Sequence, residues 1–156
     1  MFFVDSRSVE QTHRFGEMLG RELRGGDVVG VSGELGAGKT CFAQGIARGL
    51  GVDAAVPITS PTFTLVGEYP GRVTFRHADF FRVESYLRLE DAGFDDLLDR
   101  DGVLVVEWPE RVVDALPTER LDVRIELVSE TVRRFYLEGS GTRASDLAER
   151  VLGKWR

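Results

Sequence analysis

The chain of 156 residues contains no asparagine, one cysteine, two histidines and only two lysines. Without asparagine it offers no acceptor for N-linked glycosylation. The single cysteine, Cys41, excludes a disulfide framework, and together with only two histidines it excludes a Cys/His structural zinc site. Because arginine supplies nearly all of the positive charge, a motif that demands a lysine has almost no chance of arising by accident at Lys39 or Lys154.

Long apolar runs are missing as well. No stretch approaches membrane-spanning length and no basic-then-apolar leader opens the chain, so we expect a cytoplasmic protein with no membrane contact. A content of 42% hydrophobic and 29% charged residues predicts one folded domain over residues 1–156. The net charge of −6 argues against general polyanion binding, so contact with nucleic acid would need a local basic patch or a partner protein.

The apolar pattern alternates between strand and helix periods and predicts an α/β fold. Ser6 and Ser8 are candidate N-caps for the first helix, Gly51 closes the second, and Ser145 is the expected cap of the last. We expect helices over residues 9–23, 39–50, 87–98 and after 145, and strands at 28–31, 62–66, 73–79 and 103–106. Residues 121–127 and 133–137 predict a late antiparallel hairpin beside a mainly parallel sheet flanked by helices.

A phosphate-loop motif lies between the first buried strand and the second helix: Gly33-Glu34-Leu35-Gly36-Ala37-Gly38-Lys39-Thr40. Its glycines allow backbone amides to turn inward as a nest of N–H donors, and the helix adds its positive dipole end. The ammonium of Lys39 suits the β- and γ-phosphates, and the hydroxyl of Thr40 suits a magnesium ion. The motif therefore predicts a P-loop NTPase-like domain that binds a nucleotide with Mg²⁺.

Two acidic residues close predicted strands, Asp79 and Glu107. An acid at this place completes the magnesium site or positions the attacking water, and either residue meets the description. Structural alternatives stay open, a helix N-cap for Asp79 and a solvent-facing carboxylate for Glu107. A chain without asparagine lacks the guanine-specific Asn-Lys-x-Asp box, which favours ATP as the nucleotide.

Several neighbouring residues have both a functional and a structural interpretation. His77 is a site residue or a packing histidine at a strand end. Ser60, Thr62 and Thr64 form a switch segment that senses the γ-phosphate, or ordinary strand hydroxyls. Although a helix N-terminus can lower a thiol pKa, we interpret Cys41 as a small packing residue whose amide faces phosphate.

Four separated segments resemble the bacterial TsaE (YjeE) family in order and spacing. They are the phosphate loop, Ser60-Pro61-Thr62-Phe63-Thr64-Leu65-Val66, His77-Ala78-Asp79-Phe80-Phe81-Arg82 and Glu107-Trp108-Pro109-Glu110. The resemblance covers roughly residues 8–116, and the last segment is the most distinctive. Two departures are Cys41, where many relatives carry a second threonine, and Phe80-Phe81 in place of Leu-Tyr.

This resemblance implies a small ATPase that works with the TsaD and TsaB proteins to install threonylcarbamoyl on adenosine 37 of tRNA. It implies that Glu34, Leu35, Gly36, Ala37, Gly38, Lys39, Thr40 and Cys41 surround the phosphates. It also implies that Thr12 lies near the adenine, that Thr40, Glu107 and Asp79 serve the metal, and that Trp108 lies beside the nucleotide. Lys39, Asp79 and Glu107 are then the catalytic residues, and tRNA is held mainly by the partners.

Two rival functions share the phosphate loop. A small-molecule kinase needs an acceptor site or an arginine-lined lid, for which little chain is left. A non-hydrolysing, ATP-dependent adaptor needs Glu107 only to hold magnesium. No side chain stands out as a general base, so the sequence predicts slow hydrolysis by the isolated chain and faster hydrolysis in a complex.

Overall fold

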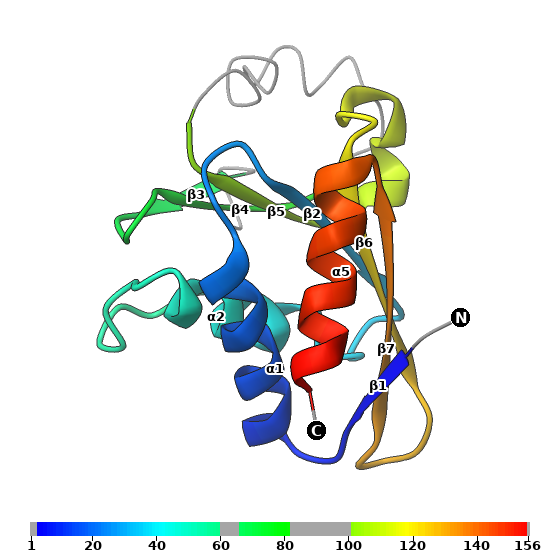
Figure 1. Ribbon diagram of the computed structural model, residues 1–156. Helices are drawn as coiled ribbons and strands as arrows, with labels where there is room; N and C mark the ends of the chain where they lie inside the picture. The colour runs from blue at the N-terminus through cyan, green and yellow to red at the C-terminus, as the bar shows by residue number, and fades with distance from the viewer. Residues whose placement is uncertain (1–2, 60–65, 82–100, 156) are drawn as a thin grey trace.

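The computed structural model describes residues 3–59, 66–81 and 101–155, and these form a seven-stranded sheet with helices packed against it (Figure 1). The strands are β1 (Phe3–Ser6), β2 (Val28–Gly33), β3 (Val66–Tyr69), β4 (Phe75–Asp79), β5 (Val103–Glu107), β6 (Arg120–Leu127) and β7 (Arg133–Ser140). The α-helices are α1 (Val9–Glu22), α2 (Lys39–Gly49) and α5 (Thr142–Lys154). Two 3₁₀ turns, η1 (Pro109–Arg111) and η2 (Val113–Ala115), follow β5.

The strand order is β1-β7-β6-β2-β5-β4-β3, and the four central strands, β6, β2, β5 and β4, run parallel. The outer strands β1, β7 and β3 are antiparallel to their neighbours. This arrangement confirms the α/β class and the late hairpin. The hairpin is also built into the sheet, because β6 lies directly beside β2 and β1 adds an edge strand to β7.

Helices α1, α2 and α5 cover one face of the sheet, where most of the hydrophobic core of the described residues lies (Figure 1). Phe15 from α1, Phe42 from α2 and Phe135 from β7 are fully buried and pack ring against ring, with centroids 5.1–5.8 Å apart. On the other face the turns η1 and η2 cover a smaller cluster that includes Val106 and Leu116. Within the described ranges no helix is long and apolar enough to cross a membrane.

Helices α1 and α2 approach each other through glycines on both sides. A Cβ atom on Gly16 would lie 2.5 Å from the carbonyl oxygen of Phe42, and one on Gly45 would lie 2.4 Å from that of His13. The same holds one turn further along, at Gly20 and Gly49. Because the two backbones are this close, α1 fixes the position of α2, whose first residue belongs to the phosphate loop.

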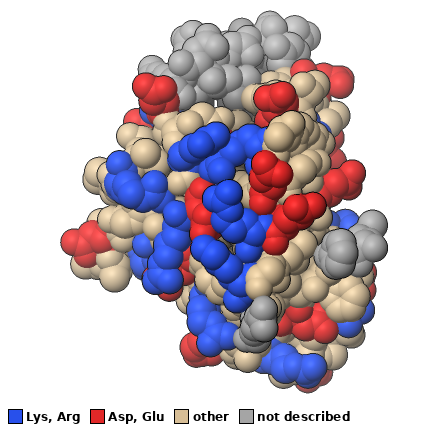
Figure 2. All heavy atoms as spheres, in the orientation of Figure 1, with Lys and Arg blue, Asp and Glu red and all other residues tan. Residues whose placement is uncertain are grey.

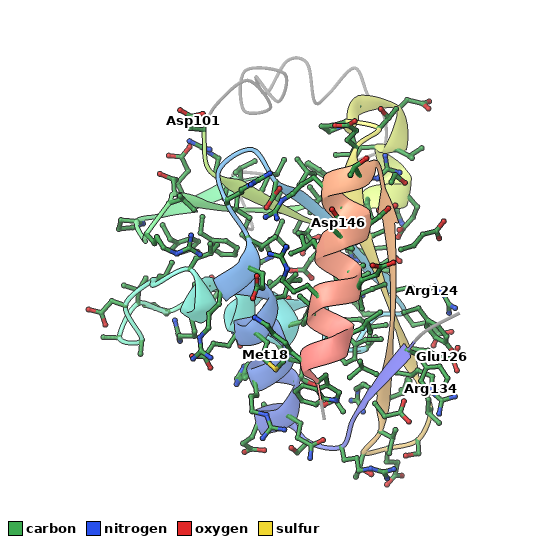
Figure 3. The ribbon with its side chains drawn as sticks, in the orientation of Figure 1. Met18, Asp101, Arg124, Glu126, Arg134 and Asp146 are labelled. Carbon is green, nitrogen blue, oxygen red and sulfur yellow. The ribbon has the colours of Figure 1, made fainter. Side chains whose placement is uncertain are left out.

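Ion pairs join the surfaces of α1 and α5. Glu22 at the end of α1 accepts hydrogen bonds from Lys154 and Arg150, and Arg143 pairs with Asp27 at 2.8 Å. Figure 2 shows basic and acidic side chains interleaved over this face. On β6 and β7, Arg124, Glu126 and Arg134 lie on the side turned away from α5 (Figure 3), which gives the hairpin the predicted solvent-facing side.

The predicted helix ends at Ser8 and Gly51 are confirmed: the Ser8 hydroxyl accepts from the amide of Gln11, and Gly51 follows the C-cap with φ +85°. The predicted cap at Ser145 is wrong, because α5 begins three residues earlier, after Gly141. Gly141 has φ 93°, which lets the chain turn from β7 directly into the helix, and the Ser145 hydroxyl donates back to the Gly139 carbonyl. Most of the strand expected at 62–66 and the helix expected at 87–98 lie outside the described residues; β3 begins at Val66.

Candidate functional site

The phosphate loop connects the end of β2 to the start of α2, at the carboxyl edge of the parallel strands. Gly36 and Gly38 have φ values of 84° and 104°, which side-chain-bearing residues rarely adopt. Gly33 is needed for a different reason: a Cβ there would lie 2.7 Å from the Ile125 carbonyl oxygen on the neighbouring strand β6. The loop can form because glycine occupies the two positions with positive φ and the position where the backbone of β2 lies closest to that of β6.

Lys39 is folded over the loop from the first position of α2. Its ammonium donates to the carbonyl oxygens of Gly33 at 2.7 Å and Glu34 at 2.8 Å, and lies 4.4 Å from the centre of the Trp108 ring. Burial lowers the pKa of Lys39, while nearby carboxylates, Glu107 foremost, act in the opposite direction. The side chain is thus held at the mouth of the loop by groups that a phosphate can replace.

Trp108 forms one wall of this mouth. Among the described residues it is the only non-glycine residue with positive φ, at φ 60° and ψ 49°. Its amide donates to the Val31 carbonyl at 3.3 Å, and its ring contacts that of Phe81 with centroids 5.0 Å apart. A non-glycine residue held in this conformation stores strain of about 1 kcal/mol, which is typical of functional sites. The backbone turn aims the indole at Lys39.

Two oxygen-bearing side chains meet beside the loop, and a third ends the neighbouring strand. The hydroxyl of Thr40 donates to the carboxylate of Glu107, with both oxygens at 3.1 Å. Asp79 is the direct register partner of Glu107 across the parallel pair β4–β5, so both acids end their strands at the same level. The carboxylate of Asp79 also accepts the amide of Phe81 at 3.0 Å, so it caps the turn that follows β4. The predicted hydroxyl and Glu107 are therefore in contact, and Asp79 ends the adjacent strand at the same level.

This donor set fits magnesium. Mg²⁺ prefers hard oxygen ligands and takes only one or two from a protein when phosphates and water supply the rest. Residues 3–59, 66–81 and 101–155 contain no cluster of three or more His, Cys, Asp or Glu side chains that could hold a metal ion. Thr40 and Glu107 are the residues that would hold the ion, and Asp79 lies next to them.

A cavity of about 230 Å³ opens on the other side of the loop, between the starts of α1 and α2 and the β6–β7 turn. Thr12, Gly38 and Cys41 line it, as does Arg133 from β7. Thr12 is buried and its hydroxyl shares a 2.7 Å hydrogen bond with Ser6. Burial raises the pKa of the Cys41 thiol, which agrees with a packing residue and not with a nucleophile.

Two further residues lie near the loop: Arg133, which the sequence did not assign to the site, and His77, for which a site role and a packing role were both left open. Arg133 donates from Nε to the carbonyl of Ala37 at 3.1 Å, although 96 positions separate them. His77 is fully buried and hydrogen-bonded to Glu107. No local sequence pattern predicts that Arg133 lies near the loop. For His77, the position near the end of a predicted strand is a weak indication of a place at the site. The segment with Ser60, Thr62 and Thr64 lies outside the described residues.

The fold and the site together define a class. A glycine loop joins a central parallel strand to a helix, a lysine and a threonine begin that helix, and acids end the adjacent strands. This is the architecture of the phosphate-loop nucleotide-binding proteins.

Comparison with known proteins gives the family. The model of the family described as "Threonylcarbamoyl adenosine biosynthesis protein TsaE" matches residues 6–135. A curated Treponema pallidum protein named tRNA threonylcarbamoyladenosine biosynthesis protein TsaE is 42% identical over 125 residues, covering 80% of this chain and 91% of that protein. The Bacillus subtilis protein of the same name is 36% identical over 143 residues, covering 91% and 88%. The chain belongs to the TsaE family.

A solved structure agrees with this assignment. The crystal structure of Bacillus subtilis YdiB superposes with a TM-score of 0.79 at 30% sequence identity, covering 96% of this chain and 93% of that one. The likeness covers more of the chain than the family model, which matches residues 6–135.

Proposed function

We propose that this protein is the ATP-binding and ATP-hydrolysing component of the machinery that makes threonylcarbamoyladenosine at position 37 of tRNA. In this proposal it uses ATP with Mg²⁺ and cycles the assembly of its partners TsaD and TsaB, which carry out the transfer and hold the tRNA. Its relatives' names supply the pathway. Because tRNA modification takes place in the cytoplasm, we expect the protein there.

The observation that carries the proposal is the meeting of Lys39, Thr40 and Glu107. A cation over the loop mouth and a hydroxyl bonded to a strand-end carboxylate are what a magnesium–nucleotide complex requires. The three side chains come from α2 and β5, and the parallel pairing of β2 with β5 brings those elements together. This supports nucleotide binding more directly than the glycine loop alone.

Each residue then has a distinct task. The loop amides and the start of α2 bind the phosphates, and Lys39 exchanges its two carbonyl partners for phosphate oxygens. Thr40 and Glu107 would hold a magnesium ion, which when bound would supply charge neutralisation on the phosphates. Asp79, one strand away, would orient water. No side chain among those described is placed as a dedicated base, so hydrolysis by the isolated chain is expected to be slow.

Exposed apolar groups at the loop support regulation by a partner. The side chain of Leu35, at the tip of the loop, is 75% exposed, and Phe81 beside Trp108 is 39% exposed. A protein that covers these groups would close the site over the phosphates and keep bulk solvent out of it. We therefore expect partner binding and nucleotide state to depend on each other.

The test is ATP turnover by the purified chain, alone and with TsaD, TsaB and tRNA. We expect turnover to rise with the partners and to vanish in Lys39→Ala. The only other lysine of the chain, Lys154, provides the matched control, because Lys154→Ala removes the same group at the end of α5, where its ammonium pairs with Glu22 on α1 and not with the loop. Turnover that ignores the partners, or that survives in Lys39→Ala, would refute the proposal.

A second variant separates hydrolysis from a purely structural use of ATP. Glu107→Ala removes the carboxylate while leaving the loop amides and Lys39 in place. Lost turnover with retained partner binding supports an ATPase, whereas full activity of the modification complex without turnover supports a non-hydrolysing adaptor. Transfer of the phosphate to a small acceptor molecule would instead indicate a kinase.

A further inference from the structure

A buried histidine lies against the carboxylate that closes β5. His77 has no exposed surface and its Nε2 is hydrogen-bonded to Oε2 of Glu107, which is itself only 2% exposed. Within the described part of the chain, the Glu107 carboxylate is hydrogen-bonded to the Thr40 hydroxyl on the loop side and to the imidazole on the sheet side. Binding of a nucleotide at the phosphate loop explains the contact of Glu107 with Thr40 but not its contact with the imidazole.

The strand register explains why the two side chains meet. Across the parallel pair β4–β5, His77 is opposite Val105 and Asp79 is opposite Glu107. Side chains two residues apart on a strand share a face, so His77 and Glu107 are diagonal neighbours on the face that carries α2. His77 precedes Asp79 on β4 and lies further from the carboxyl edge of the sheet, where the phosphate loop is. Its link to the nucleotide site therefore runs through its hydrogen bond to Glu107.

The environment of the imidazole fixes its orientation. The ring of Phe75, which precedes His77 on the same face, is stacked against it, with centroids 6.0 Å apart and planes 22° from parallel. An ionised carboxylate only accepts hydrogen bonds, so the proton of this pair is carried by Nε2. The Nδ1 atom is buried and has no hydrogen-bond partner among the described residues, which suits a lone pair better than an N–H group.

We propose that His77 is a positioning residue for the magnesium site. Its Nε2–H group holds Oε2 of Glu107, so that the carboxylate stays turned toward Thr40 instead of rotating into other orientations. A buried carboxylate with only one donor would lose part of its solvation and its fixed direction. This inference rests on the proposed function, because it concerns the ion that accompanies the nucleotide.

The prediction is a loss of magnesium dependence, not of nucleotide binding itself. Partners that orient a metal ligand typically change metal affinity about 10–100-fold when they are removed. Three variants define the role. His77→Leu deletes the donor, His77→Asn places an amide near the Nδ1 position, and His77→Gln places an N–H donor near the Nε2 position. The affinity for ADP is measured by calorimetry in Mg²⁺ and in EDTA, together with the thermal unfolding temperature.

We expect wild type to bind ADP more tightly in Mg²⁺ than in EDTA. In His77→Leu and His77→Asn this gain should shrink about 10-fold, with the affinity in EDTA unchanged, and His77→Gln should recover most of it. If one of the two donor-deleting variants does not fold, the other carries the comparison. Val105→Ala is the packing control, since it removes volume opposite His77 and should lower stability without altering the gain.

Distinct results overturn distinct claims. An undiminished gain in His77→Leu or His77→Asn overturns the positioning role, and so does a His77→Gln variant that behaves like them. A loss of the gain in Val105→Ala equal to that in His77→Leu would reduce His77 to a packing residue. A wild-type chain that binds no ADP, or binds it equally in EDTA, refutes the proposed magnesium–nucleotide function, and the inference falls with it.

Discussion

Replacing Gly45 with alanine tests whether the close approach of α1 and α2 holds the fold together. The new methyl group would lie 2.4 Å from the His13 carbonyl oxygen and 3.1 Å from Cα of Gly16. Ordinary contacts between such atoms are about 3.5 Å or longer, so the helices must separate by about 1 Å. Both obstacles are backbone atoms of a helix, and a change of rotamer cannot relieve them.

The magnitude follows from two opposing effects. Overpacking costs about 1–3 kcal/mol, and a contact with rigid backbone places Gly45→Ala at the upper end of that range. Alanine is a better helix former than glycine by about 1 kcal/mol, which offsets part of the cost. We therefore expect Gly45→Ala to lower the free energy of unfolding by about 2 kcal/mol.

The matched control is Gly153→Ala near the end of α5, where a Cβ would meet nothing within 4 Å. This variant keeps the propensity gain without the clash, so it should be neutral or more stable by up to about 1 kcal/mol. Urea denaturation followed by circular dichroism measures both. A Gly45→Ala variant as stable as wild type would refute the argument, as would an equal loss in Gly153→Ala.

Further predictions concern the charged groups around the site and between the helices. Hydrogen bonds from Lys154 first, and then Arg150, lower the pKa of Glu22, so their stabilisation is present above its usual pKa and is lost as the pH falls through the lowered value. Glu22→Gln should therefore cost about 0.5–1 kcal/mol near pH 7 and flatten the fall in stability as the pH drops below the usual pKa of a glutamate. Denaturation curves with the same pH dependence in variant and wild type would contradict this. Arg133→Met removes the hydrogen bond from β7 to the Ala37 carbonyl and should lower the free energy of unfolding by about 1 kcal/mol. It should also weaken ADP binding, which calorimetry measures. Unchanged values of both would mean that this contact has no role.

The order of the strands could not be predicted from local sequence. Two apolar runs, Val28–Val31 and Val103–Val106, predict buried strands. Neither run indicates that β2 lies between β5 and β6. The edge strand β1 is a four-residue segment whose partner, β7, is about 130 positions away. Pairing over such separations depends on which faces remain to be buried after the helices have docked.

The close packing of α1 and α2 was likewise hidden. Gly16 and Gly20 on one helix, and Gly45 and Gly49 on the other, are four apart, yet glycine inside a helix normally signals weakness or a helix end. The close contact between the two helices explains why glycine occupies these positions, and a local sequence pattern does not show that contact. The early start of α5 has a similar cause, since Gly141 rather than Ser145 makes the turn that the exit from β7 requires.

By itself the sequence determined the chemistry of the site: a glycine loop with Lys39 and Thr40, and acids at the ends of two apolar runs. These signals are local, because a loop that bends around phosphate needs glycines at fixed spacing and a buried strand needs consecutive apolar residues. The tertiary structure decided which of these groups meet. Strand register set Asp79 opposite Glu107 and His77 diagonal to it, and the hairpin brought Arg133 to the loop, since contacts between distant segments depend on the packing of the whole sheet.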